Sequence, residues 1–304
     1  MTSPPNQAEA DLPSALAAVL QRYRDGGLSA EVAVMQLLLA CPDLEPLFDC
    51  LDRVGSRPEF APLRRLACDN RDRLEQTARL IASGLAGERN TVEAIREQFD
   101  RAVALAPEAS VALYSLGMQS TLDRATAEIV ARLREWGLLG RGRAVLDIGC
   151  GIGRFEAALA PEVAAITGID VAAGMIAEAR RRCAGFSNVS LCQCSGAGLA
   201  EFADESFDFV LAVDTFPYLV AADPAIAARH VADAARLLRP AGALVILNYS
   251  YRSDLDGDRS EVARLASEHG FTVEHSGTRD FALWDGTTFL LRKPKTLTVP
   301  HRRG

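Results

Sequence analysis

The stretch AVLDIGCGIGRF, residues 144–155, is the most informative part of the chain. A short apolar run meets an acidic residue and three alternating glycines, and helix-forming residues follow from Glu156 to Ala160. This order predicts a buried strand, a tight turn and a helix. Glycine suits such a turn because it adopts backbone conformations that a Cβ forbids and lets a ligand approach the main chain. The turn is therefore predicted to bind a ligand.

The spacing of the glycines narrows the choice of ligand. A dinucleotide fingerprint places its third glycine three residues after its second, and that position is Arg154 here. The glycines instead stand two residues apart, giving D-x-G-x-G-x-G from Asp147 to Gly153. This pattern resembles the first motif of the class I S-adenosylmethionine-dependent methyltransferases. The resemblance implies that Asp147, Gly149, Gly151 and Gly153 hold the methionine moiety of that cofactor.

Further motifs follow in the order that the same family shows. Residues 165–170 form a second apolar run, and its last residue, Asp170, is expected to accept hydrogen bonds from both ribose hydroxyls. Residues 204–214 predict a surface turn and a buried strand ended by Asp214, with residues 215–218 as a loop beside the sulfonium. The order L-L-R-P-x-G at 237–242 matches the family's motif before the fifth strand. The resemblance spans residues 122–293.

The resemblance implies a cofactor site built at the ends of these strands. The family often has an acidic residue in the loop after the third strand, where this chain has Ser195, so adenine recognition is the weakest part of the comparison. The candidates for cofactor binding are Asp147, Gly149, Cys150, Gly151, Gly153, Asp170, Val171, Met175, Ser195, Gly196, Asp214, Thr215 and Phe216.

Aromatic and polar residues follow the fourth and fifth strands, at the edge where open α/β sheets place ligands. Phe216 and Tyr218 are expected to form an aromatic wall beside the cation, and core packing is the competing interpretation. No general base stands out. Tyr249 and Tyr251 are candidates to accept or relay a proton, whereas a nucleophilic amine or thiol acceptor would need no strong base, so the acceptor is left open. The substrate candidates are Tyr114, Tyr218, Asn248, Tyr249, Tyr251, Arg252 and Trp284, and the catalytic candidates among them are Tyr218, Tyr249, Tyr251 and Arg252.

Composition limits the possible partners. The formal net charge of −7 over 304 residues disfavours nucleic-acid substrates, and no apolar run is long enough to predict a membrane span. Residues 1–11 lack the order of a signal peptide, so a cytoplasmic protein is expected. The seven scattered cysteines are expected to be reduced and mostly buried, and no metal site is predicted. The oligomeric state is left open.

The predicted fold is α/β, a Rossmann-like doubly wound sheet of seven strands with one antiparallel edge strand, preceded by an all-helical region. Residues 1–121 are expected to form a helical cap or lid, with an independent helical bundle as the competing interpretation. Residues 122–294 are expected to form the catalytic domain that binds S-adenosylmethionine, and residues 295–304 a tail.

The resemblance implies methyl transfer from S-adenosylmethionine to a small-molecule acceptor. One alternative keeps the cofactor and changes the chemistry, by cyclisation of its aminobutyrate arm or by aminocarboxypropyl transfer, with release of methylthioadenosine. The other alternative is a non-catalytic module that binds the cofactor and recruits a partner.

Overall fold

The computed structural model describes residues 12–85, 91–284 and 286–295. The chain divides into two compact units that interleave along the sequence. We call them the helical unit, which comprises Met1–Gly87, Gln98–Ile129 and Phe281–Asp285, and the sheet unit, which comprises Glu88–Glu97, Val130–Asp280 and Gly286–Gly304. The predicted boundary between residues 121 and 122 stays a prediction, and residues 296–304 of the predicted tail lie outside the described residues.

Short helices build the described part of the first 121 residues, which contains no strand, as the sequence predicted. In chain order they are α2 (Ser14–Arg24), α3 (Ala30–Ala40), α4 (Leu44–Val54), α5 (Ala61–Asp69), α6 (Arg71–Leu80), the π-helical turn η1 (Ile81–Leu85), α7 (Val92–Leu105), α8 (Pro107–Val111), the 3-10 turn η2 (Leu113–Ser115) and α9 (Gln119–Glu135). Helices α7 and α9 each continue from one unit into the other.

Local side-chain contacts explain where these helices start and stop. The Ser29 hydroxyl accepts a hydrogen bond from the N–H of Val32 at 3.2 Å and so caps α3. Helices α5 and α6 are separate, because Asn70 between them leaves the helical conformation at φ −125° and ψ 27°. The Asn70 amide donates to the Leu66 carbonyl at 2.9 Å, which satisfies an end group of α5.

A short segment from late in the chain belongs to the helical unit. The carboxylate of Glu128 in α9 accepts hydrogen bonds from the N–H groups of Ala282, at 2.6 Å, and Leu283, at 3.2 Å. Trp284 is buried and meets Phe281 edge to face, with 5.4 Å between ring centroids. The connection between the last two strands is therefore tied to the helices by its backbone.

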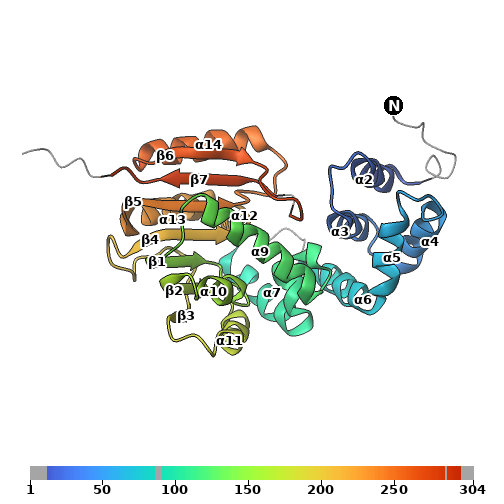
Figure 1. Ribbon diagram of the computed structural model, residues 1–304, viewed down its shortest axis with the longest axis horizontal. Coiled ribbons are helices and arrows are strands. Elements are labelled where there is room, and N and C mark those ends of the chain that lie inside the picture. The colour runs from blue at the N-terminus through green and yellow to red at the C-terminus, as the bar shows by residue number, and fades with distance from the viewer. Residues whose placement is uncertain (1–11, 86–90, 285, 296–304) are drawn as a thin grey trace, which may run out of the picture. The chain divides into compact units, whose positions relative to one another are not determined.

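The sheet unit contains seven strands in the order β3-β2-β1-β4-β5-β7-β6 (Figure 1). Neighbours among β1 to β5 pair in parallel, and β7 runs antiparallel to both β5 and β6. The predicted fold class is thus confirmed. The strands are β1 (Gly140–Ile148), β2 (Val163–Asp170), β3 (Val189–Gln193), β4 (Phe207–Val213), β5 (Leu238–Leu247), β6 (Thr272–Thr278) and β7 (Thr288–Arg292).

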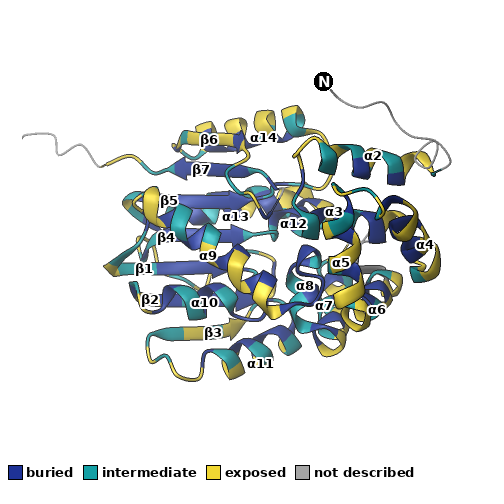
Figure 2. Ribbon diagram, turned by 45° about the vertical axis from the view of Figure 1, so that its right-hand side comes forward, coloured by how far each residue is buried: buried dark blue, intermediate teal, exposed yellow. Residues whose placement is uncertain are grey.

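Helices cover both faces of this sheet. On one face, α12 (Phe216–Ala222), α13 (Pro224–Leu237) and α14 (Leu255–Glu268) share an apolar core with Leu146, Val210 and Leu244 of the strands. The helices α10 (Arg154–Leu159) and α11 (Ala173–Arg182) pack against β2. The strands β4 and β5 and the second half of β1 are mostly buried, whereas the edge strand β3 is largely exposed (Figure 2). Parallel strands buried on both faces explain the near-continuous apolar runs in the sequence.

Two sequence predictions about this unit are corrected by the structure. Residues 215–218 were predicted as a loop, but a helix begins at Phe216, since Pro217 fits the first turn of a helix. All seven cysteines are free, yet only three are buried, so the prediction that most are buried is wrong. Cys192 is exposed because it lies on the edge strand β3.

A membrane-spanning helix and a metal site are both absent from residues 12–85, 91–284 and 286–295. No helix there is both long and apolar enough to cross a bilayer. No group of three or more His, Cys, Asp or Glu side chains in the same ranges is arranged to hold a metal ion.

Candidate cofactor and acceptor site

The glycine turn links β1 to α10 in the predicted strand–turn–helix order. Its three glycines have φ angles of 76°, 54° and 79°, all in the left-handed region. The N–H groups of Gly149 and Cys150 both donate to the carbonyl of Ile169 on β2, at 2.8 and 3.0 Å. A Cβ on Gly149 would lie 2.7 Å from Cγ2 of Thr215, so no larger residue fits without rearrangement. The turn is held tightly between two strand ends.

Asp170 is the last residue of β2, and its carboxylate binds the backbone of the glycine turn. Its side chain is 9% exposed. One carboxylate oxygen accepts from the N–H of Gly151 at 3.0 Å, and the other accepts from the N–H of Ala172 at 2.9 Å. Such charge-assisted bonds are among the stronger hydrogen bonds in proteins. The carboxylate is therefore oriented by backbone groups of two loops, while its predicted ribose role stays a prediction.

Asp147, two residues before the turn, is almost completely buried at 1% exposure. Glu156 of α10 is 0% exposed. None of the four carboxyl oxygens has a hydrogen-bonding donor among the described residues. Burial raises the pKa of Asp147, and burial together with the charge of Asp147 raises the pKa of Glu156 well above its ordinary range. The site thus contains a buried pair of acids.

Asp214 and Asn248, at the carboxyl ends of β4 and β5, form a second group of polar residues. Both adopt a left-handed backbone, with φ of 54° and 66°. The Asn248 amide donates to Oδ1 of Asp214 at 2.7 Å and accepts from the N–H of Thr287 at 3.0 Å. The Tyr251 hydroxyl also donates to Oδ1 of Asp214, at 3.1 Å. Non-glycine residues with positive φ often cluster at functional sites.

Two tyrosines flank this carboxylate. The rings of Tyr218 and Tyr251 meet edge to face, with 5.9 Å between centroids, and Tyr251 is 58% exposed. Burial and the charge of Asp214 raise the pKa of Tyr218. Tyr218 therefore keeps its proton at neutral pH.

Three other candidate residues have different partners. Phe216 and Tyr249 are fully buried in the apolar core, with 5.8 Å between their ring centroids. Tyr249 offers no exposed hydroxyl to a substrate, and burial raises its pKa. Arg252 is engaged by α14 through ion pairs to Asp258, at 2.8 Å, and Glu261, at 2.9 Å.

The remaining candidates lie at several places. Met175 of α11 is buried, Gly196 is buried in the loop after β3, and Ser195 beside it is exposed. Tyr114 and Trp284 are buried side chains of the helical unit. The roles predicted for these residues stay predictions.

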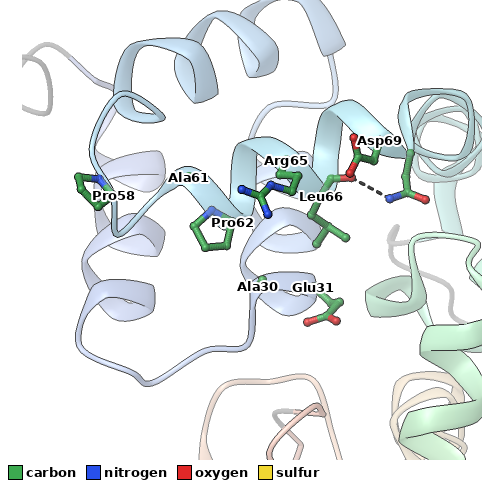
Figure 3. A pocket seen from close by; sticks show the side chains of 9 residues that line it. Ala30, Glu31, Pro58, Ala61, Pro62, Arg65, Leu66 and Asp69 are labelled. Carbon is green, nitrogen blue, oxygen red and sulfur yellow. Dashed lines mark hydrogen bonds between the residues drawn. The ribbon is translucent and has the colours of Figure 1, made fainter.

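The helical unit carries a surface hollow of its own (Figure 3). Its volume is about 440 Å³, and residues of α3 and α5 line most of it, among them Glu31, Arg65 and Leu66. Glu31 pairs with Arg124 at 3.0 Å. None of the site residues predicted from the sequence lines this hollow.

Sequence reasoning missed Glu156 and Gly168. Gly168 pairs with Asp147 across the β1–β2 ladder. A Cβ on Gly168 would lie 2.9 Å from both Cδ of Glu156 and Cβ of Cys150. The glycine therefore makes room for the Glu156 carboxyl. An isolated glycine inside the strand pattern ITGID was the signal, since such a glycine often marks a close approach.

Comparison with known proteins identifies the domain. A family model for a methyltransferase domain matches residues 145–242. Demethylmenaquinone methyltransferase of Tropheryma whipplei is 36% identical over 110 residues, which are 36% of this chain and 43% of that protein. Ubiquinone biosynthesis O-methyltransferase of Paracidovorax citrulli is 36% identical over 104 residues, which are 34% of this chain and 42% of that protein. The chain thus spans under half the length of these relatives.

A solved structure agrees at the level of the fold. Phosphoethanolamine N-methyltransferase 1 of Haemonchus contortus, solved with phosphoethanolamine and S-adenosylhomocysteine, aligns with a TM-score of 0.52 at 17% identity. The alignment covers 68% of this chain and 49% of that one. Residues 145–242 thus match a methyltransferase domain, and the glycine turn within them resembles the first motif of the class I S-adenosylmethionine-dependent methyltransferases.

Proposed function

We propose that the chain transfers the methyl group of S-adenosylmethionine to a small-molecule acceptor. The observation that carries this proposal is the joining of the glycine turn to Asp170 through the Gly151 N–H, at the carboxyl ends of β1 and β2. In open α/β sheets this edge is where nucleotide-like ligands bind. The match to a methyltransferase family model over the same strands supports the choice of cofactor.

The residues at this edge fit S-adenosylmethionine in charge and in space. Asp170 would accept hydrogen bonds from the ribose hydroxyls, because its carboxylate is already oriented by two backbone N–H groups. The glycines of the turn would let the methionine moiety approach the backbone. When bound, the cofactor supplies an electrophilic methyl group on a sulfonium. The protein's remaining task is to hold the acceptor in line with the bond that breaks.

The group formed by Asp214, Asn248, Tyr218 and Tyr251 is our candidate for holding the acceptor. The Asp214 carboxylate is positioned by Asn248 and Tyr251 at 2.7 and 3.1 Å. It would accept a hydrogen bond from a hydroxyl or amine of the acceptor, while Tyr218 keeps its proton. Because Tyr218 keeps its proton, the acceptor would need a nucleophile that is active near neutral pH.

The names of two relatives suggest which acceptors to test first. Both relatives are named for quinone methylation or biosynthesis, so hydroquinones and phenols lead the panel, followed by amines and thiols. The test incubates the protein with methyl-labelled S-adenosylmethionine and each acceptor. Labelled product together with S-adenosylhomocysteine is the expected result. A protein that fails to bind the cofactor in calorimetry would contradict the proposal.

The same experiment distinguishes the alternatives. Release of methylthioadenosine would indicate attack on the aminobutyrate arm rather than on the methyl group. Tight cofactor binding with no product from any acceptor class, including a metabolite extract, would favour a non-catalytic module. The identity of the adenosyl product distinguishes the two chemistries, and the binding isotherm shows whether the cofactor binds at all.

A further inference from the structure

Two carboxyl groups share a closed space on the α10 side of the sheet. Asp147 belongs to β1 and Glu156 to α10, and they are 1% and 0% exposed. The Glu156 carboxyl lies against Gly168, which pairs with Asp147 across the β1–β2 ladder. The space for the Glu156 carboxyl exists because Gly168, the strand neighbour of Asp147, has no side chain. Asp147 on β1, Gly168 on β2 and Glu156 on α10 therefore pack together, and the glycine leaves the room that the Glu156 carboxyl occupies.

Two ionised carboxylates side by side in this buried space would cost much free energy. An isolated buried charge is expensive, and two like charges in contact push at least one pKa upward. No donor among the described residues satisfies any of the four oxygens. A single proton between the two groups reduces both costs, because one carboxyl then donates to the other and only one negative charge remains.

Within the described residues, the other titratable groups near Asp147 and Glu156 are an arginine, an aspartate and three cysteines. The positive charge of Arg154 lowers the pKa of Asp147, and the charge of Asp170 raises it. Three neighbouring thiols stay protonated at neutral pH: burial raises the pKa of Cys150 well above its usual value, and the pKa values of Cys183 and Cys194 to about 11. Among these neighbours the carboxyl pair is thus the group that can exchange a proton near neutrality.

We propose that Glu156 is a positioning residue of the cofactor site, which shares one proton with Asp147 in the ligand-free protein and loses it to solvent when the cofactor binds. The reason is electrostatic. The cofactor brings a sulfonium and an ammonium, and positive charge near the pair favours two carboxylates over a shared proton. The inference rests on the proposed function, since it concerns the same cofactor.

The proposal predicts that cofactor affinity rises with pH. If binding releases one proton, the dissociation constant falls by up to about tenfold for each pH unit over the range in which the free protein keeps the proton and the complex does not. S-Adenosylhomocysteine lacks the sulfonium charge, so its binding is expected to release less of the proton. A residue that only filled space would produce neither effect.

Calorimetry in buffers with different heats of ionisation tests the proposal, because it counts the protons released on binding. Wild-type protein is compared with Glu156→Gln, which keeps the shape and can donate a hydrogen bond to Asp147 without titrating. The matched control is Glu162→Gln, just beyond α10, whose carboxylate pairs with Arg134 at 2.7 Å. Wild type and control are expected to release most of one proton, and Glu156→Gln close to none.

The outcomes separate failure of this inference from failure of the proposed function. Cofactor binding without proton release in wild type, or with equal release in Glu156→Gln, overturns the role of Glu156 and leaves the function intact. Absence of cofactor binding in wild type overturns the function and this inference together. As a second variant, Gly168→Ala should crowd the Glu156 carboxyl and weaken binding several-fold, and unchanged affinity and proton release in that folded variant would contradict the geometry.

Discussion

Asp170 shows how one side chain can organise a binding site before the ligand arrives. Its two oxygens accept from Gly151 and Ala172, so the residue joins two loops as well as presenting a charge. Replacing it with alanine removes charge-assisted bonds that contribute about 2–3 kcal/mol. We expect Asp170→Ala to weaken cofactor binding by about 30- to 150-fold in calorimetry.

The matched control for this substitution is Asp208→Ala. Asp208 lies near the start of β4, at the opposite end of the sheet, and also accepts two hydrogen bonds, from the N–H of Ala144 and from Arg239. Its loss should reduce stability and leave the cofactor affinity within about twofold of wild type. Equal weakening by the two substitutions would mean that Asp170 acts through general stability and not through the site.

Single residues also mark the limits of prediction from the sequence. Asp147 and Asp170 were found because acids at strand ends in a glycine-rich pattern have few other uses. Phe216 and Tyr249 were assigned to the site by position along the chain, yet both rings point into the core. Position at a strand end does not fix the side to which a side chain turns, because that depends on the packing of neighbouring helices.

At the scale of elements, the glycine turn is the feature whose geometry explains the most. Gly149→Ala would place a methyl group against Thr215 and hold alanine at a φ near 76°. Backbone strain and overpacking together should cost about 2–4 kcal/mol. We expect a lower free energy of unfolding and a clear loss of cofactor affinity, measured by urea denaturation and calorimetry.

Gly270→Ala is the control that separates the cost of backbone strain from the cost of overpacking. Gly270 has a similar φ of 72°, but a Cβ there meets nothing within 4 Å. This control should lose only about 1 kcal/mol of unfolding free energy from strain and should bind the cofactor normally. If Gly149→Ala and Gly270→Ala had the same unfolding free energy and the same cofactor affinity, the close approach of Gly149 to Thr215 would not matter for cofactor binding.

The connection between β6 and β7 supports a different prediction. Glu128 accepts the N–H groups of both Ala282 and Leu283. Glu128→Ala leaves these amides without their acceptor, so they should exchange hydrogen faster, by up to about tenfold for each 1.4 kcal/mol lost. Hydrogen exchange with mass spectrometry would detect the change in the peptide around Trp284.

Glu135→Ala is the control for that experiment. Glu135 is on the same helix and pairs on the surface with Arg132 at 2.6 Å. Surface pairs of this kind contribute little, so exchange near residue 282 should not change. Equal exchange in Glu128→Ala and wild type would show that the segment is held by Trp284 packing rather than by its backbone.

For the whole molecule, the sequence predicted the fold class. The doubly wound sheet of seven strands and the helical first part follow from local patterns and motif order, and both are confirmed. The interleaving of the two units was missed, because residues 281–285 join the helical unit through contacts with residues more than 150 positions earlier. Local periodicity carries no information about such long-range contacts. The cap role of the helical unit stays a prediction.

The pH dependence of stability gives the last prediction. An acid whose pKa is raised in the folded state stabilises the protein below its ordinary pKa, and this contribution is lost as pH rises through the folded value. The raised pKa values of Asp147 and Glu156 therefore predict that wild type loses stability relative to Glu156→Gln as pH rises above about 4.5, the ordinary value of Glu. The slope is at most about 1.4 kcal/mol per pH unit for one proton.

The measurement has to report on the sheet unit alone. Of the chain's two tryptophans, Trp136 belongs to the sheet unit and Trp284 to the helical unit. Urea denaturation in a Trp284→Phe background would thus follow Trp136. His230, whose pKa is lowered by burial, destabilises the fold as pH falls, but it is common to both variants and cancels in their difference. If the stability of wild type relative to Glu156→Gln stays constant between about pH 4.5 and 8, or rises with pH, no proton is held between Asp147 and Glu156.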